Sequence, residues 1–137
     1  MTALKQIMIL IIIFMIPTFQ GVGQTKLTVA DVKLIESSYQ LCLDKGANML
    51  GCSVEYYYNI NSCLSDAYDN LIKHLNAPQK AALEKEQNIW LKKRDRRFKA
   101  IDQKNRMEGR DGQMIRQSEK AHFVKARALD LIWRGHN

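Results

Sequence analysis

Residues 53–75 read SVEYYYNINSCLSDAYDNLIKHL, and this stretch decides the fold class of the chain. Its apolar side chains recur every three or four residues, which is the spacing of one face of an α-helix. A helix of this length cannot bury its apolar stripe alone, so we expect other helices to pack against it. The stripe consists of Tyr57, Ile60, Leu64, Ala67, Tyr68, Leu71 and Leu75.

Three further segments show the helical period, and none shows sustained strand alternation bounded by hairpin turns. Thr28 and Asp31 resemble a capping box at the start of the first segment, with Asp in place of Glu. Asn76 can cap the third segment, and Pro78 suits its first turn. We therefore predict an all-α fold, a compact bundle of about four helices with one long central helix. The predicted helices span residues 29–43, 53–75, 79–107 and 113–133.

The composition is that of one globular domain rather than of a disordered or low-complexity chain. The 137 residues suffice for a single core, and 46 % of them are hydrophobic. The 21 Lys and Arg residues outnumber the 14 Asp and Glu residues, so the formal net charge is +7. This balance favours acidic partners, although charge affects encounter and solubility rather than fold.

Residues 1–23 are typical of a secretory signal peptide. Lys5 precedes the consecutive apolar residues 7–16, and small residues follow at the place that a signal peptidase reads. We expect cleavage after Gly23, which would leave 24–137 as one exported mature domain, periplasmic or secreted. The alternative is an uncleaved anchor, but a membrane-spanning helix needs about 20 apolar residues. We therefore expect the mature chain not to span a membrane.

The expected export places the three cysteines of the chain in an oxidising compartment, where paired cysteines form disulfides. Cys42 and Cys52 flank the first loop, so a bridge between them would join the first helix to the second. A bridge from Cys52 to Cys63 is the alternative, but one continuous helix would separate these residues by about 16 Å, beyond the ~7 Å limit between Cα atoms. We favour the Cys42–Cys52 disulfide and expect Cys63 to be a small, partly buried hydrophobic side chain.

The sequence offers little for catalysis or for a cofactor. His74, His122 and His136 lack the spacing of metal ligands, and no nucleophile–base pair or Gly-rich phosphate loop is evident. We therefore expect no enzymatic activity, no catalytic residue, no metal and no cofactor. The basic run 92–97 (KKRDRR) could follow a phosphate backbone. Its spread around the helix and the expected export argue against nucleic acid and favour a solvated helix face.

Gln87, Trp90 and Arg94 form the most informative set in the chain, with Asp95 beside them. Their spacing of i, i+3 and i+7 places the first three on one helix face. Polar groups on a core-facing stripe need partners, because burial without a hydrogen bond is costly. One interpretation is a structural network of hydrogen bonds and cation–π contacts that ties this helix to its neighbours. The alternative is a binding surface, and we favour the structural interpretation.

The pattern Gln87-x-x-Trp90-x-x-x-Arg94-Asp95 is similar to that of the family named after the lysozyme inhibitor LprI, which consists of small secreted bacterial helical domains. The order of further matching residues strengthens the resemblance over nearly all of the mature chain. Phe98 is a departure, because it stands where the family often has a Cys, and we expect apolar packing there in place of a second disulfide. The other residues that resemble the family pattern are Cys42, Cys52, Tyr68, Leu83, Arg127 and Leu131.

The resemblance implies an exported, non-enzymatic binding protein, with lysozyme or another envelope or host protein as its partner. Loss of Lys5 with the signal peptide would lower the net charge to +6, which repels a cationic lysozyme at long range. Contact would therefore use a local acidic patch such as Glu55, Asp66 and Asp69. The alternative function is that of an envelope-associated structural or stress protein that binds anionic cell-wall polymer or lipid through its basic surface.

Overall fold

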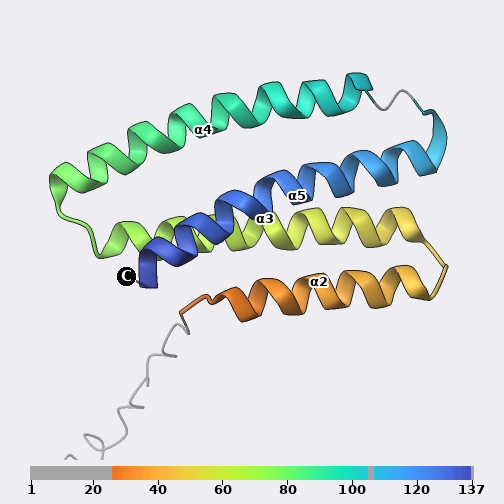
Figure 1. The fold of residues 1–137 in the computed structure, drawn as a ribbon, viewed down its shortest axis with the longest axis horizontal. Helices are drawn as coiled ribbons and strands as arrows, with labels where there is room; N and C mark the ends of the chain where they lie inside the picture. Colours follow the sequence, from red (N-terminus) through yellow and green to blue (C-terminus); the bar gives the residue numbers. More distant parts are fainter. Residues whose placement is uncertain (1–25, 105–106, 137) are drawn as a thin grey trace, which may run out of the picture.

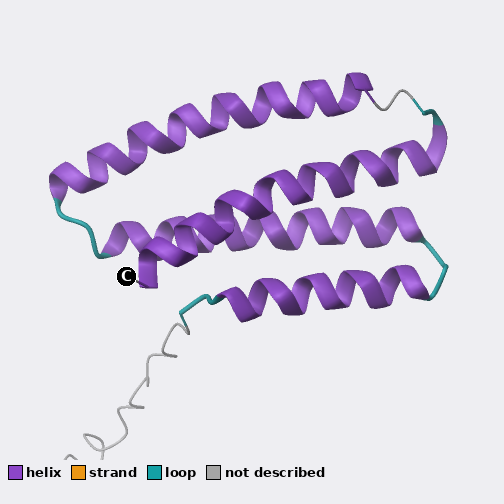
Figure 2. Ribbon diagram, in the orientation of Figure 1, coloured by secondary structure: helices purple, strands orange, loops and turns teal. Residues whose placement is uncertain are grey.

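The computed structural model of the chain describes residues 26–104 and 107–136. These residues form α-helices and no strand, which confirms the predicted all-α class (Figure 2). Successive helices run antiparallel, as expected for helices joined by short connections (Figure 1). The helices are α2 (Val29–Asp44), α3 (Met49–Lys73), α4 (Ala77–Lys104) and α5 (Gly109–His136).

The core lies between α3 and α5, which make the most extensive contact in the molecule. α2 packs against both of these helices, and α4 lies on the opposite side of the pair, mainly against α5 (Figure 1). Of the 28 residues in α4, only Leu83 and Ile101 are buried. The long helix predicted over 79–107 is therefore present, and most of its surface faces solvent.

The stripe predicted within residues 53–75 supplies much of the core. Ile60 on α3 and Val124 on α5 are completely inaccessible to solvent. Ala67 and Ala128 are also buried, and small side chains of this kind let two helix backbones approach closely. Tyr57, Tyr68 and Leu75, from the same stripe, are partly buried at the edge of the core.

Both predicted helix caps are confirmed. The Thr28 backbone N–H donates to Asp31 Oδ2 at 2.7 Å, and the Asp31 N–H donates to Thr28 Oγ1 at 3.4 Å, which completes a capping box before α2. Asn76 and Gln79 form the same reciprocal pair before α4, with both hydrogen bonds at 3.0 Å. These pairs satisfy backbone donors that the first turn of a helix leaves unpaired.

The start of α3 differs from the expectation, because the helix begins at Met49 rather than at Ser53. Asn48 adopts the left-handed conformation with φ 52°, which Asn tolerates better than most residues, and the chain turns into the helix directly after it. The Asn48 side chain also accepts a hydrogen bond from Arg110 Nη2 at 3.0 Å. The glycine at position 51, which suggested a loop, therefore lies inside the first turn of α3.

The last helix also begins earlier than expected, at Gly109 rather than at Gln113. Gly112 was expected to belong to a loop, but it is a buried helical residue that lies against the preceding chain. A Cβ atom at position 112 would sit 1.9 Å from the Met107 carbonyl oxygen. Glycine is thus required here by close backbone approach rather than as a helix breaker.

The predicted disulfide between Cys42 and Cys52 is present, with a Cα–Cα distance of 5.8 Å. It joins the last turn of α2 to the first turn of α3, next to the connection between them. Cys63 is free and buried, and burial raises the pKa of its thiol. Its environment is that of the small hydrophobic side chain that we expected.

No helix in residues 26–104 and 107–136 is both long enough and apolar enough to cross a membrane. The predicted signal peptide, residues 1–23, lies outside the described residues. It therefore stays a prediction.

Candidate functional site

Arg127 on α5 joins the last two helices at the family-like motif. Its Nε and Nη2 atoms donate to Gln87 Oε1 on α4 at 3.1 and 3.0 Å. Its Nη1 atom donates to Glu86 Oε1 and, at 2.8 Å, to Asp130 Oδ2. The Arg127 side chain is only 8 % exposed, so these partners offset the cost of burying a guanidinium.

Glu86 extends this network toward the end of α5. Arg134 Nη1 donates to Glu86 Oε1 at 2.8 Å, so one carboxylate receives two arginines from the same helix. Burial alone would raise the pKa of Glu86, but the hydrogen bonds from Arg134 and Arg127 outweigh it and lower the pKa below its usual value. The carboxylate thus stays ionised and holds α4 against α5. We call Glu86, Gln87, Arg127, Asp130 and Arg134 the arginine clasp.

Trp90 lies one turn further along α4 and contacts the same neighbour. Its ring stacks on Phe123 of α5 with the ring centroids 5.9 Å apart. Phe98 packs edge-on against Phe123 and against Tyr57 of α3. The aromatic side chains therefore fill the space between α4 and helices α3 and α5. Phe98 provides the apolar packing expected where the family often has a Cys.

Arg94 and Asp95 lie at the outer edge of this cluster. The Arg94 guanidinium is positioned over the Trp90 and Phe98 rings, about 5.9 and 5.8 Å from their centroids. Its Nη2 atom donates to Asp95 Oδ1 at 2.8 Å, and the Asp95 side chain is 66 % exposed. This ion pair joins neighbours on one helix, so it stabilises the position of Arg94 rather than the contact between helices.

The remaining motif residues support the same junction. Leu83 and Leu131 are buried in the core. Tyr68 is half-buried and lines a small cleft of about 160 Å³ together with Gln87. The structure therefore brings Tyr68, Leu83, Gln87, Trp90, Arg127 and Leu131 to one junction of α3, α4 and α5, with Arg94 and Asp95 at its surface.

Sequence reasoning missed part of this junction. Glu86, Phe123, Asp130 and Arg134 were not singled out, although they contact the motif residues directly. The spacing of Asp130 and Arg134 from Arg127 on one helix face was the only available signal. The Arg127–Gln87 contact spans 40 residues, and local spacing cannot show such a contact.

A second candidate site follows from the distribution of charge. α2 and α3 together carry two lysines and six carboxylates, a net charge of −4. α4 and α5 together carry 15 Lys and Arg residues and seven carboxylates, a net charge of +8. The two sides of the bundle thus differ in sign, although the whole chain is basic.

The acidic side contains a groove between α2 and α3, of about 490 Å³. Asp31, Asp66 and Asp69 line it together with one basic residue, Lys73, and Leu34, which is 66 % exposed, adds an apolar edge. Hydrogen bonds from Thr28 lower the pKa of the Asp31 carboxyl, so it stays ionised in mildly acidic solution. We call Asp31, Leu34, Asp66 and Asp69 the acidic groove. Asp66 and Asp69, two of the three carboxylates expected to form a patch, line this groove, whereas Glu55 lies nearer the N-terminal end of α3.

A metal centre has no support in residues 26–104 and 107–136. No group of three or more His, Cys, Asp or Glu side chains there has an arrangement that could hold a metal ion.

Comparisons with known proteins agree with the motif. A family model described as "Lysozyme inhibitor LprI" matches residues 42–131, well over half of the chain. No curated protein and no solved structure matches the chain significantly. The matched range contains the disulfide, the acidic residues of α3, Leu131 and all of the arginine clasp except Arg134.

Proposed function

The chain belongs to the LprI family of lysozyme inhibitors, and we propose that it is an exported, non-enzymatic protein that inhibits lysozyme through its acidic groove. The family is one of inhibitors rather than of enzymes. The signal peptide expected in residues 1–23 would deliver the protein to the compartment in which lysozyme acts. The observation that carries the choice of surface is the separation of charge between the two sides of the bundle.

The charge separation answers the objection that a basic chain should repel a basic enzyme. Packed helices are about 8–10 Å apart, so α4, on the far side of the α3–α5 pair, is roughly 20 Å from α2. The Debye length at physiological ionic strength is about 8 Å. A cationic partner at the α2–α3 side is therefore attracted by the nearby carboxylates and largely screened from the lysines of α4. Lys125 of α5 does reach α2, but it is paired there with Glu36.

The groove also has the chemistry of a protein contact. Asp66 and Asp69 are three residues apart on α3, so their carboxylates point to the same side. Leu34 and Ile35 of α2 supply apolar surface beside them. Ion pairs give a complex its orientation and its association rate, and a buried apolar contact adds affinity. A lysine- or arginine-rich edge of lysozyme fits both features.

Lysis of a peptidoglycan suspension by lysozyme, with and without the purified protein, tests the function. We expect the wild-type protein to slow lysis, and the Asp66→Asn/Asp69→Asn variant to need at least about tenfold more protein for the same effect. The matched control is Glu84→Gln/Glu108→Gln, which removes the same charge away from the groove. Inhibition by the control should equal that of the wild type.

Two outcomes would count against the proposal in different ways. An unchanged lysis rate at excess wild-type protein would show that the protein does not inhibit lysozyme. Equal inhibition by both double variants would show that the protein inhibits lysozyme through a surface other than the acidic groove. Circular dichroism of all three proteins shows whether the variants keep the fold.

The alternative function rests on the basic side of the molecule. Lys92, Lys93, Arg96 and Arg97 on α4 are exposed, which suits anionic cell-wall polymer or lipid. This alternative predicts co-sedimentation with bacterial envelopes that is lost at high salt. Co-sedimentation that does not depend on salt concentration, or the absence of co-sedimentation, would argue against this alternative.

A further inference from the structure

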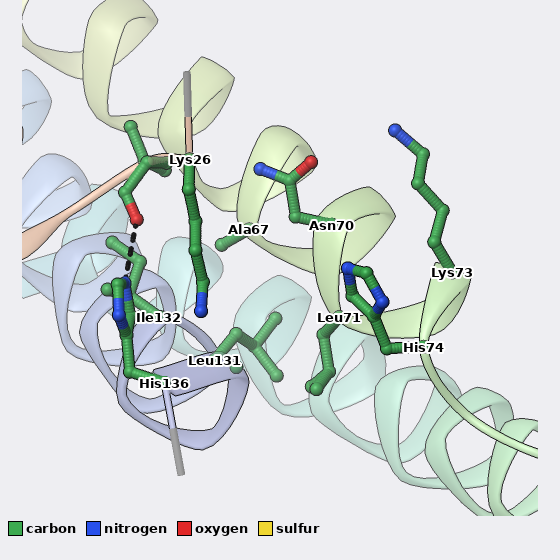
Figure 3. A pocket seen from close by; sticks show the side chains of 11 residues that line it. Lys26, Ala67, Asn70, Leu71, Lys73, His74, Leu131, Ile132 and His136 are labelled. Carbon is green, nitrogen blue, oxygen red and sulfur yellow. Dashed lines mark hydrogen bonds between the residues drawn. The ribbon is translucent and has the colours of Figure 1, made fainter. Parts of the chain in front are cut away.

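A second pocket lies where the last turns of α3 and α5 meet the N-terminal end of the described chain (Figure 3). It adjoins the acidic groove, with which it shares Leu27, Asn70 and Lys73. Its volume is about 200 Å³. Lys26 and Leu27, which precede α2, cross one side of it. The His136 ring nitrogen Nε2 donates to the Leu27 carbonyl oxygen at 3.1 Å, so the end of α5 holds this crossing segment in place.

The floor of the pocket is apolar. Leu71 of α3 and Leu131 and Ile132 of α5 line it, together with Ala67. These four residues also belong to the hydrophobic core, so the floor is rigid and continuous with the interior. Apolar cavities of about 150 Å³ are large enough for a benzene-sized ligand. The pocket therefore has room for a short aliphatic chain.

The rim of the pocket is basic. His74 and His136 lie on opposite sides of it, and Lys26 lines it between them (Figure 3). The fourth basic residue of the lining, Lys73, extends away from the opening in the same view. Among the described residues that line the pocket there is no Asp or Glu. Its chemistry is thus opposite to that of the acidic groove, whose carboxylates lie on the α2 side of α3.

We propose that this pocket binds a free aliphatic carboxylate, with the alkyl chain on the floor of Leu71, Leu131 and Ile132 and the carboxylate at Lys26 and His74. Lys26 is exposed, so its ammonium can pair with an anion at the rim while the alkyl chain of the same ligand lies on the apolar floor. A carboxylate accepts charge-assisted hydrogen bonds from lysine and imidazole donors. Burial of the alkyl chain supplies the remaining affinity. The proposal is independent of lysozyme inhibition.

Titration calorimetry of the purified protein with three ligands of equal chain length tests this assignment. We expect saturable binding of octanoate, binding of octanol that is about tenfold weaker, and no detectable binding of octylammonium. Equal affinity for octanoate and octanol would overturn the role of the basic rim. The absence of saturable octanoate binding would overturn the site.

Two variants locate the ligand. Gly135 lines the pocket, and a Cβ atom there would meet no atom within 4 Å, so Gly135→Leu places a side chain in open space. We expect this variant to lose octanoate binding. Lys26→Gln should weaken octanoate binding about tenfold and leave octanol binding unchanged.

The matched control is Lys33→Gln, which removes a lysine that does not line the pocket. Its octanoate affinity should equal that of the wild type. If Gly135→Leu fails to fold, the comparison of Lys26→Gln with Lys33→Gln still decides the proposal. Equal affinities for these two lysine variants would place the carboxylate elsewhere.

Discussion

Arg127 and Gln87 are joined by two hydrogen bonds to a single amide oxygen, at 3.1 and 3.0 Å, across 40 residues of chain. α4 has only two buried residues, so its attachment to α5 depends strongly on this contact and on the aromatic stack beside it. In this chain, the residues of the family motif mainly hold α4 against α5.

Arg127→Ala should destabilise the protein by about 2–3 kcal/mol, because it removes the charge-assisted hydrogen bonds to Gln87 and Glu86, while Glu86 keeps Arg134. Chemical denaturation measures this loss directly. Arg94→Ala is the control, since its ion pair is exposed and lies within one helix. We expect the control to cost about 1 kcal/mol or less. Equal losses would mean that the clasp adds nothing beyond a surface pair.

Trp90→Ala should cost about 3 kcal/mol, the lower end of the range for large aromatic truncations, because the ring is only partly buried. The loss reflects the stack on Phe123 and the cover of the core by α4. Thermal unfolding followed by circular dichroism provides the measurement. A melting temperature close to that of the wild type would show that Trp90 is free for a binding role.

The arginine clasp should make stability depend on pH in acid. The folded pKa of Glu86 is lowered, so the unfolded chain binds more protons near the ordinary value of 4.5. The stabilisation by Glu86 is therefore complete above that value and disappears as the pH falls through the lower folded pKa. The effect is screened, because the side chain is 44 % exposed.

Melting temperatures of the wild type and of Glu86→Gln, measured from about pH 6 to about pH 3, check this expectation. The wild type should be more stable at the upper end, and the difference should shrink in acid as Glu86 gains a proton. A constant difference across the range would contradict the assignment of the ionised carboxylate to the clasp.

Two stacked tyrosines should respond differently to loss of the hydroxyl group. Tyr39 and Tyr56 stack with centroids 4.3 Å apart, and Tyr39 Oη lies 3.1 Å from Ser53 Oγ. The Tyr56 hydroxyl is buried, has no hydrogen-bond partner among the described residues, and has its pKa raised by burial to about 12.

Tyr39→Phe should therefore cost about 1 kcal/mol, the usual net value of a hydrogen bond, whereas Tyr56→Phe should be neutral or stabilising. Urea unfolding of the two variants gives both values. A larger loss for Tyr56→Phe than for Tyr39→Phe would indicate that the Tyr56 hydroxyl has a hydrogen-bond partner in solution.

The features that could be predicted from sequence are those encoded by local spacing. The apolar period of residues 53–75 specified a helix with one buried face, and the Thr28–Asp31 pair specified where α2 starts. Asn76 caps α4 as expected, although that helix begins at Ala77 rather than at Gln79. The Cys42–Cys52 disulfide followed from the same local geometry. The starts of α3 and α5 were misjudged, because Asn48 and Gly112 act through backbone conformation and close approach.

By itself, the sequence determined that the chain forms antiparallel amphipathic helices and which face of most of them is buried. Only the tertiary structure decided that Glu86 and Gln87 meet Arg127, that acidic and basic helices occupy opposite sides, and that a basic pocket forms where α3 and α5 end. The physical reason is that helix periodicity depends on neighbours three or four residues away. Contacts between helices depend instead on how residues far apart in the chain are brought into register by packing.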